Sequence, residues 1–163
     1  MAETSISYPA DPRDVESIDA IIAAAYDVIS GPAGKKRDWN RERSLFYPGA
    51  LIAPTASVPG RNDVELEPQI LDVEKYIARV EPLLEEGFYE TEVMRRTEQF
   101  GRIAHVWSTY ESRYDLSEPE PFMRGINSFQ LFNDGKRWWI LSVYWQHESP
   151  DHTIPNKYLQ GRV

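Results

Sequence analysis

The chain has 163 residues, of which 26 are Asp or Glu and 18 are Lys or Arg, giving a formal net charge of −8. This acidic balance, with no basic stripe, argues against nucleic acid and anionic membranes as partners. The length suits one domain, residues 1–163, and the absence of cysteine excludes disulfides and thiolate nucleophiles.

The first twelve residues, Met1 to Pro12, are polar and lack the basic and apolar regions of a secretory signal. No apolar run in the sequence approaches the roughly 20 residues that a membrane-spanning helix needs. We therefore expect a soluble, cytoplasmic protein.

The first predicted helix begins after Asp11, which can cap it, and ends at Gly31-Pro32. Its apolar residues recur at helical spacing and predict one face packed on a core. They are Val15, Ile18, Ile22, Ala25, Tyr26 and Ile29.

A second, short helix is expected after Asp38, carrying Trp39, Leu45 and Phe46, with Pro48 and Gly49 ending it. Residues 50–53 and 64–71 then form two apolar runs that can pair as a ribbon, in which Pro68 favours an edge position.

A third helix is predicted from about Asp72 to Glu86, with a kink at Pro82 and an end at Gly87. Its apolar side chains indicate a buried face. The acidic run from Glu81 to Glu90 is interpreted as a solvated helix end.

Four long alternating runs in the second half predict strands at Phe88–Phe100, Arg102–Arg113, Met123–Asn133 and Arg137–His147. Asn133-Asp134-Gly135 predicts a hairpin turn between the last two, because these residue types accept positive φ angles. Helices followed by such strands indicate an α+β domain with helices packed on one curved antiparallel sheet.

The last strand is apolar on both faces, and one of these faces carries Trp139, Leu141, Val143 and Trp145. An antiparallel sheet with one solvated face would alternate apolar with polar residues. We therefore expect a homodimer that covers the outer face of this strand.

This order of elements, with Phe129-x-Leu131, Asp134-Gly135 and Trp138-x-Ile140 in the terminal hairpin, resembles the nuclear transport factor 2-like (NTF2-like), or SnoaL-like, superfamily. The resemblance implies a cystatin-like cone of three N-terminal helices and a bent sheet around a pocket. Members include cofactor-free isomerases, dehydratases and hydrolases as well as non-catalytic scaffolds. No complete catalytic set can be carried over to this chain.

Three aromatic residues and a histidine are candidate site residues. Tyr26 can donate a hydrogen bond to a ligand inside the cone, or simply continue the apolar stripe. Trp39 can lie at the pocket mouth as a lid. His105 is a possible general base, and Tyr110 lies on the opposite face of its strand, so which of them faces the pocket stays open.

Asn127 shares a strand face with Phe129, and by period-two alternation Ser142 and Tyr144 share the face of Trp138. Polar groups among aromatic residues suit a site for a small molecule, although they can instead satisfy backbone groups at a bend of the sheet. We expect a mostly apolar pocket, without a charge cluster, for a neutral organic ligand.

The histidines and carboxylates show no metal-ligand spacing, and no phosphate loop is present in the sequence, so neither a metal nor a cofactor is predicted. Two hypotheses follow. The chain is a small-molecule-binding protein, catalytic or not, or it is a non-catalytic dimeric interaction or scaffold module.

Overall fold

The structure, a computed structural model, describes residues 8–57 and 66–160. Its elements in chain order are α1 (Pro12–Val15), α2 (Ile18–Ile29), α3 (Trp39–Leu45), β1 (Phe46–Ser57), β2 (Leu66–Pro68), α4 (Val73–Val80), the 3-10 helix η1 (Glu81–Leu84), β3 (Tyr89–Phe100), β4 (Ile103–Arg113), β5 (Met123–Asn133), β6 (Trp138–His147) and the 3-10 helix η2 (Asn156–Tyr158).

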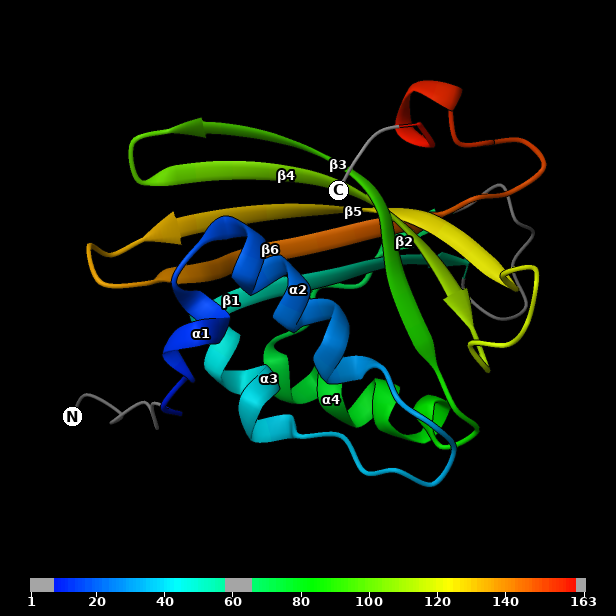
Figure 1. Cartoon of the computed structure of the whole chain (residues 1–163), viewed down its shortest axis with the longest axis horizontal. Helices are drawn as coiled ribbons and strands as arrows, with labels where there is room; N and C mark the ends of the chain where they lie inside the picture. The colour runs from blue at the N-terminus through cyan, green and yellow to red at the C-terminus, as the bar shows by residue number, and fades with distance from the viewer. Residues whose placement is uncertain (1–7, 58–65, 161–163) are drawn as a thin grey trace.

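The strands form one curved sheet in the order β2-β1-β6-β5-β4-β3. The helices α2, α3 and α4 lie together on one side of it (Figure 1). This arrangement confirms the predicted α+β fold class. The sheet is mixed, because β1 pairs with β6 in parallel while the four long predicted strands pair antiparallel.

The predicted first helix is two helices. Asp11 caps α1 by accepting a hydrogen bond from the Arg13 amide. Ser17 then adopts an extended conformation, with φ −145° and ψ 166°, and its hydroxyl accepts a bond from the Ala20 amide. Because this serine caps a new helix, the first helix ends after α1, and residues 8–57 and 66–160 form four α-helices where three were expected.

The second predicted helix is shorter than expected. Asp38 caps α3 as predicted, but the helix ends at Leu45, and Phe46 already belongs to β1. Gly49 lies within this strand at φ +84°, where the pairing of β1 with β6 changes register. Gly49, which was expected to end the helix, instead lies at a bulge inside a strand.

The third predicted helix begins as expected at the cap residue Asp72 and tightens into η1 at Glu81-Pro82. Gly87, at φ +91°, closes it. The predicted ribbon is present, since β1 pairs antiparallel with β2 and Thr55 lies opposite Pro68. Residues 64 and 65 of that prediction lie outside the described residues.

The four long strands lie within one residue of their predicted bounds, but β6 contains a bulge at Leu141. Leu131 pairs with Ile140 and Gln130 pairs with Ser142, which leaves Leu141 without a partner on β5. One extra residue moves all later side chains of a strand to the opposite face. Alternation counted from Trp138 therefore fails beyond Ile140.

The bulge also corrects the predicted outer face of β6. Val143 is buried and Trp145 packs its ring on Tyr76 of α4, so both lie on the helix side of the sheet. Apolar residues on both faces of β6 thus reflect a shift of face within the strand. The predicted dimer interface cannot include these two residues as outward groups.

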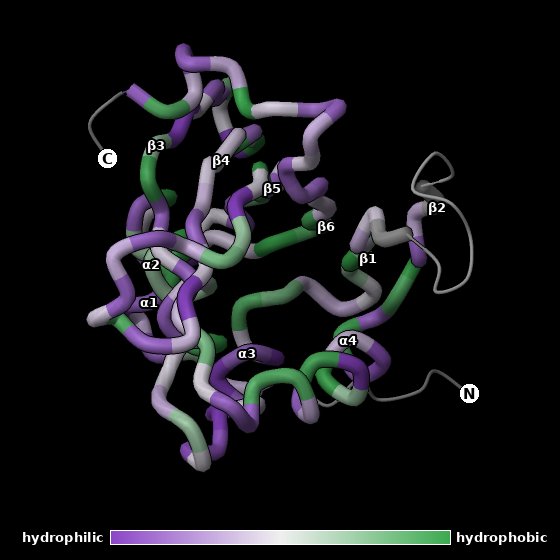
Figure 2. The backbone as a smooth tube through the Cα atoms, turned by 90° about the vertical axis from the view of Figure 1, so that its right-hand side faces the viewer, coloured by the Kyte–Doolittle hydropathy of each residue, from purple (hydrophilic) through white to green (hydrophobic). Residues whose placement is uncertain are grey.

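The C-terminal segment covers part of the sheet on the side opposite the helices (Figure 2). Ile154 is buried, and Tyr158 of η2 packs its ring against Trp107 of β4, with 6.0 Å between ring centroids. These contacts hold the apolar C-terminal segment against the body of the protein.

Among residues 8–57 and 66–160, none of the helices is both long and apolar enough to span a membrane.

Candidate functional site

A cavity of about 200 Å³ lies between the helices and the concave face of the sheet. Its wall is mostly apolar and comes from α2, α3, β1, α4, η1, β3, β5 and β6. Its lining residues include Tyr26, Glu42, Phe46, Tyr76, Arg79, Glu90, Asn127, Val143, Trp145 and His147. Ligand pockets usually have about 300–1,000 Å³, so this cavity suits a molecule of about one ring.

Tyr26 and Asn127, both candidate site residues in the sequence, meet in the wall of this cavity. The Asn127 Nδ2 donates to the Tyr26 hydroxyl at 3.1 Å, and the Tyr26 and Ser108 hydroxyls lie 2.6 Å apart. Ser108 donates its own proton to Glu92 at 2.7 Å, so the proton between the two hydroxyls belongs to Tyr26.

This network anchors the wall and leaves the Tyr26 hydroxyl without a free proton to donate to a ligand. The phenol donates its one proton to Ser108 and accepts from Asn127, and burial raises its pKa far above the ordinary value. Beyond Ser108, Glu92 forms a bidentate ion pair with Arg95, with oxygen-to-nitrogen distances of 2.8 and 2.6 Å. Tyr26 is therefore a buried structural donor. Of the two roles that the sequence left open, ligand donor or part of the apolar stripe, its bonds do not fit the first.

Glu90 brings a carboxyl group to the same cavity from the start of β3. Its Oε1 accepts a hydrogen bond from the second Nδ2 proton of Asn127 at 3.2 Å, and Ser112 approaches Oε2 at 3.5 Å. Burial raises the Glu90 pKa to about 7, although the bonds from Asn127 and Ser112 oppose the rise. This carboxyl group can therefore exchange a proton near neutral pH.

Glu42 of α3 is a second carboxyl group in the cavity wall. Its side chain is 3% exposed, and its Oε2 has no hydrogen-bond partner among the described residues. Burial raises its pKa to about 8, although the charge of the neighbouring Arg41 lowers it. A buried oxygen without a partner costs about 1–3 kcal/mol, which makes it a candidate contact for a ligand.

Tyr76 of α4 lies within electrostatic reach of both carboxyl groups. Burial raises its pKa most, and the charges of Glu42 and Glu90 raise it further. Its ring meets that of Trp145 nearly at a right angle, 82°, with centroids 6.1 Å apart. The two rings form a corner of the cavity wall.

His147 lines the cavity two residues beyond Trp145 on β6, and Tyr110, which is not among the lining residues, contacts it. The Tyr110 hydroxyl lies 2.8 Å from Nδ1 of His147, and burial lowers the pKa of the histidine, so the neutral imidazole dominates at pH 7. Tyr110 is 1% exposed and faces the helices. This placement resolves which face of β4 points inward.

The remaining predicted site residues do not line this cavity. The bulge at Leu141 turns Ser142 and Tyr144 outward, and Tyr144 is 50% exposed. His105 lies on the outer face of β4, where its Nε2 pairs with Ser128 at 3.1 Å. Trp39 is no lid, because its indole nitrogen donates to Glu81 at 2.9 Å and the ring does not border the cavity.

Sequence reasoning missed Glu42, Glu90 and His147 as cavity residues. Glu42 is surrounded in sequence by charged residues typical of a solvated helix, and Glu90 ends an acidic run interpreted as solvated. The cavity expected to lack a charge cluster therefore has two carboxyl groups in its wall. A signal was available for Glu90, because alternation along β3 places it on the same face as Glu92, before the register shift between Glu92 and Met94.

Arg79 is the one basic side chain among the cavity-lining residues that the structure describes. It donates to the side-chain oxygen of Gln69, and its charge acts on the Tyr76 hydroxyl. Among the residues that the structure describes, His, Asp and Glu side chains do not form any group of three that could hold a metal ion.

No family model matches the chain, and no curated protein does. Solved structures do. An NTF-2-like protein of unknown function from Silicibacter pomeroyi DSS-3 is 15% identical, with a TM-score of 0.54 over 82% of this chain and 94% of that one. A protein of unknown function with a cystatin-like fold from Nostoc punctiforme PCC 73102 is 10% identical, with a TM-score of 0.57 over 82% and 90%. The yeast UBP3-associated protein BRE5 is 11% identical, with a TM-score of 0.57 over 80% and 93%.

The molecule is thus an α+β protein whose helices and curved sheet enclose a small cavity. It has the NTF2-like, or SnoaL-like, fold of the cystatin-like class, as the resemblance implied. At these identities the likeness shows the fold alone.

Proposed function

We propose that the protein binds a small, mostly apolar organic molecule in the cavity and transfers a proton to or from it, as a cofactor-free isomerase, lyase or hydrolase. The observation that carries the proposal is Glu90, a cavity carboxyl group with a pKa of about 7, held by Asn127 through one oxygen. A general acid or base works best when its pKa lies near the working pH.

The roles of the wall residues follow from their bonds. Glu90 accepts or returns the proton. Asn127 is a positioning residue, because it joins Glu90 to the buried Tyr26 hydroxyl at 3.2 and 3.1 Å. Val143, Phe46 and their apolar neighbours exclude water and hold the carbon skeleton.

The test is a thermal-shift screen with single-ring compounds, followed by a cavity-filling variant. Ala25→Phe places a ring in the cavity from α2, whereas Ala23→Phe adds the same ring to an exposed position of that helix. A ligand at 100 times its Kd stabilises the wild type by about 2.7 kcal/mol. That gain should vanish in Ala25→Phe and persist in Ala23→Phe. Equal gains in both variants would reject the cavity as the binding site.

The second candidate function is a non-catalytic dimeric interaction module. The exposed apolar side chains Leu51 and Tyr144 on the outward face of β1 and β6 favour it. The yeast protein of the same fold, which is named as UBP3-associated, gives a further reason to consider it. If the protein is an interaction module, Ala25→Phe leaves its activity in the cell intact and Tyr144→Glu abolishes it. If it acts on a small molecule in the cavity, the effects of the two variants are reversed.

A further inference from the structure

Glu42, Tyr76 and Trp145 all line the cavity, and Glu42 has a buried carboxyl oxygen without a partner in the described part of the chain. Glu42 is 3% exposed and its Oε2 has no hydrogen-bond partner among the described residues. Tyr76, whose pKa responds to the Glu42 charge, meets Trp145 at 82°. A carboxylate beside aromatic faces is a surrounding that stabilises an ammonium group.

We propose that the ligand of this cavity is a small organic amine with one apolar ring, bound as its ammonium ion to Glu42. This inference rests on the proposed function and replaces the neutral ligand expected from the sequence. The ammonium N–H donates to the free Oε2 of Glu42, and the rings of Tyr76 and Trp145 contact its positive charge.

When the amine binds, its ammonium ion takes the place of the proton on the Glu42 carboxyl group. In the ligand-free protein at pH 7, Glu42 carries a proton because burial raises its pKa to about 8. The ammonium ion stabilises the carboxylate, so that proton leaves to solvent as the amine binds. An aliphatic amine has a pKa of about 10 and stays charged throughout this range.

The other titratable or charged groups near the site do not reverse this dependence. Besides the neighbouring Arg41, those that line the cavity are Tyr26, Tyr76, Arg79, Glu90 and His147. The tyrosine pKa values are raised and that of His147 is lowered, so all three stay neutral above pH 7. Glu90 ionises with a pKa of about 7 and favours a cation in the same direction as Glu42.

Calorimetry with 2-phenylethylamine and its uncharged isostere 2-phenylethanol tests the inference on the wild-type chain. The amine should bind about tenfold more tightly at pH 7 than at pH 6, the change in the ionised fraction of a group with a pKa of about 8. Comparing buffers of different ionisation enthalpy at pH 7 should show proton release with the amine and none with the alcohol.

Glu42→Gln should remove the proton release and reduce amine affinity at least tenfold. Glu16→Gln, the same substitution at an exposed position of the chain, should alter neither. If the alcohol binds as tightly as the amine, or if the affinity for the amine does not depend on pH in the wild type, the ammonium site is wrong while the cavity proposal stands. If neither probe binds, the ammonium inference fails, and the compound screen described above decides the cavity proposal separately.

Discussion

The Tyr110 hydroxyl reaches across β5 to lie 2.8 Å from Nδ1 of His147 on β6. The residue that it crosses is Gly125, which pairs with Tyr110 on one side and with His147 on the other. A Cβ atom at Gly125 would meet the Tyr110 hydroxyl and come within 2.6 Å of the Gln146 carbonyl oxygen. The absence of a side chain here lets a tyrosine from one strand bond a histidine two strands away.

Gly125→Ala should therefore destabilise the protein by about 1–3 kcal/mol, because the added methyl group overpacks a closed site. Urea unfolding monitored by tryptophan fluorescence measures this loss. Tyr110→Leu alone should also be destabilising, and combining it with Gly125→Ala should cost less than the sum of the two. Full additivity would mean that the tyrosine is not what the methyl group displaces.

Tyr26→Phe removes a hydroxyl with two buried partners, Ser108 at 2.6 Å and Asn127 at 3.1 Å. We expect a loss of about 1–3 kcal/mol, because the variant leaves these polar groups without their bonds. Tyr47→Phe is the matched control, since Tyr47 is 43% exposed and should change by less than about 0.5 kcal/mol. Equal effects of the two variants would contradict the anchoring role of the network.

Stability should fall as the pH rises from about 6.5 to 8. Burial raises the pKa values of Glu90 to about 7 and of Glu42 to about 8, so the folded state holds protons that the unfolded state has already released. The stabilisation is complete below the unfolded pKa, near 4.5, and is lost as the pH passes the folded values. His147 acts in the opposite direction only below its ordinary pKa of 6.5.

Denaturation at several pH values checks this, with an expected slope of at most about 1.4 kcal/mol per pH unit for each ionising carboxyl group. Glu42→Gln should flatten the slope and raise stability at pH 8. Glu16→Gln, which removes an exposed charge, should leave the slope as it is. A wild-type slope of zero over this window would show that both carboxyl groups titrate at ordinary values.

The homodimer stays a prediction, now with a different interface. The outward apolar side chains of β1 and β6 include Leu51, Leu141 and Tyr144, exposed by 50%, 37% and 50%. Leu51→Glu combined with Tyr144→Glu should yield monomers in light scattering at micromolar concentration. Leu116→Glu, a charge on the loop before β5, should remain dimeric. A monomeric wild type would end the dimer hypothesis.

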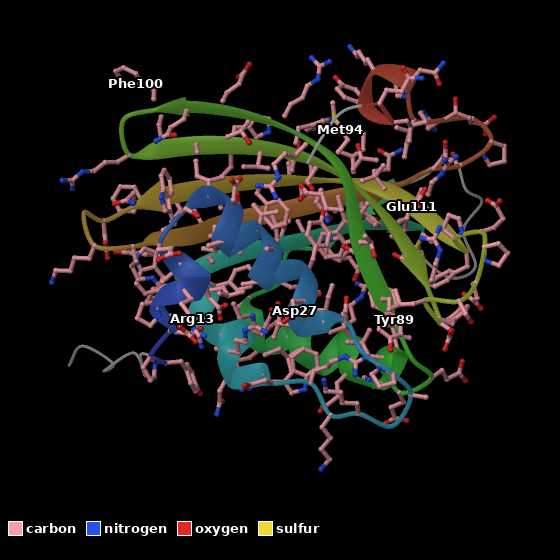
Figure 3. All side chains as sticks on the ribbon, in the orientation of Figure 1. Arg13, Asp27, Tyr89, Met94, Phe100 and Glu111 are labelled. Atoms are coloured by element: carbon pink, nitrogen blue, oxygen red, sulfur yellow. The ribbon has the colours of Figure 1, made fainter. Side chains whose placement is uncertain are left out.

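Phe100 is an exposed apolar residue that does not by itself indicate an interface. At the end of β3 it is 85% exposed and projects away from the body of the protein (Figure 3). A single exposed ring needs no partner to explain it. The outward set on β1 and β6 differs because several such side chains share one sheet face.

Local chemistry determined much of this fold from the sequence. Asp11 and Asp38 each cap a helix as predicted, and Asp72 caps the helix that was predicted to begin there, since an aspartate beside free backbone amides acts within a few residues. Period-two alternation located the long strands for the same reason, because a pleat repeats over neighbouring residues. These signals need no knowledge of the rest of the chain.

Only the tertiary structure decided the contents of the cavity. The single extra residue Leu141 turned Tyr144 outward and brought Val143 and Trp145 inward, and such a bulge arises from pairing with β5, not from β6 alone. Glu42 and Glu90 resemble solvated carboxylates in sequence, yet packing of α3 and β3 around the same space removed them from water. Burial is a property of the assembled layers, and it is burial that raises the pKa of each carboxyl group toward neutrality.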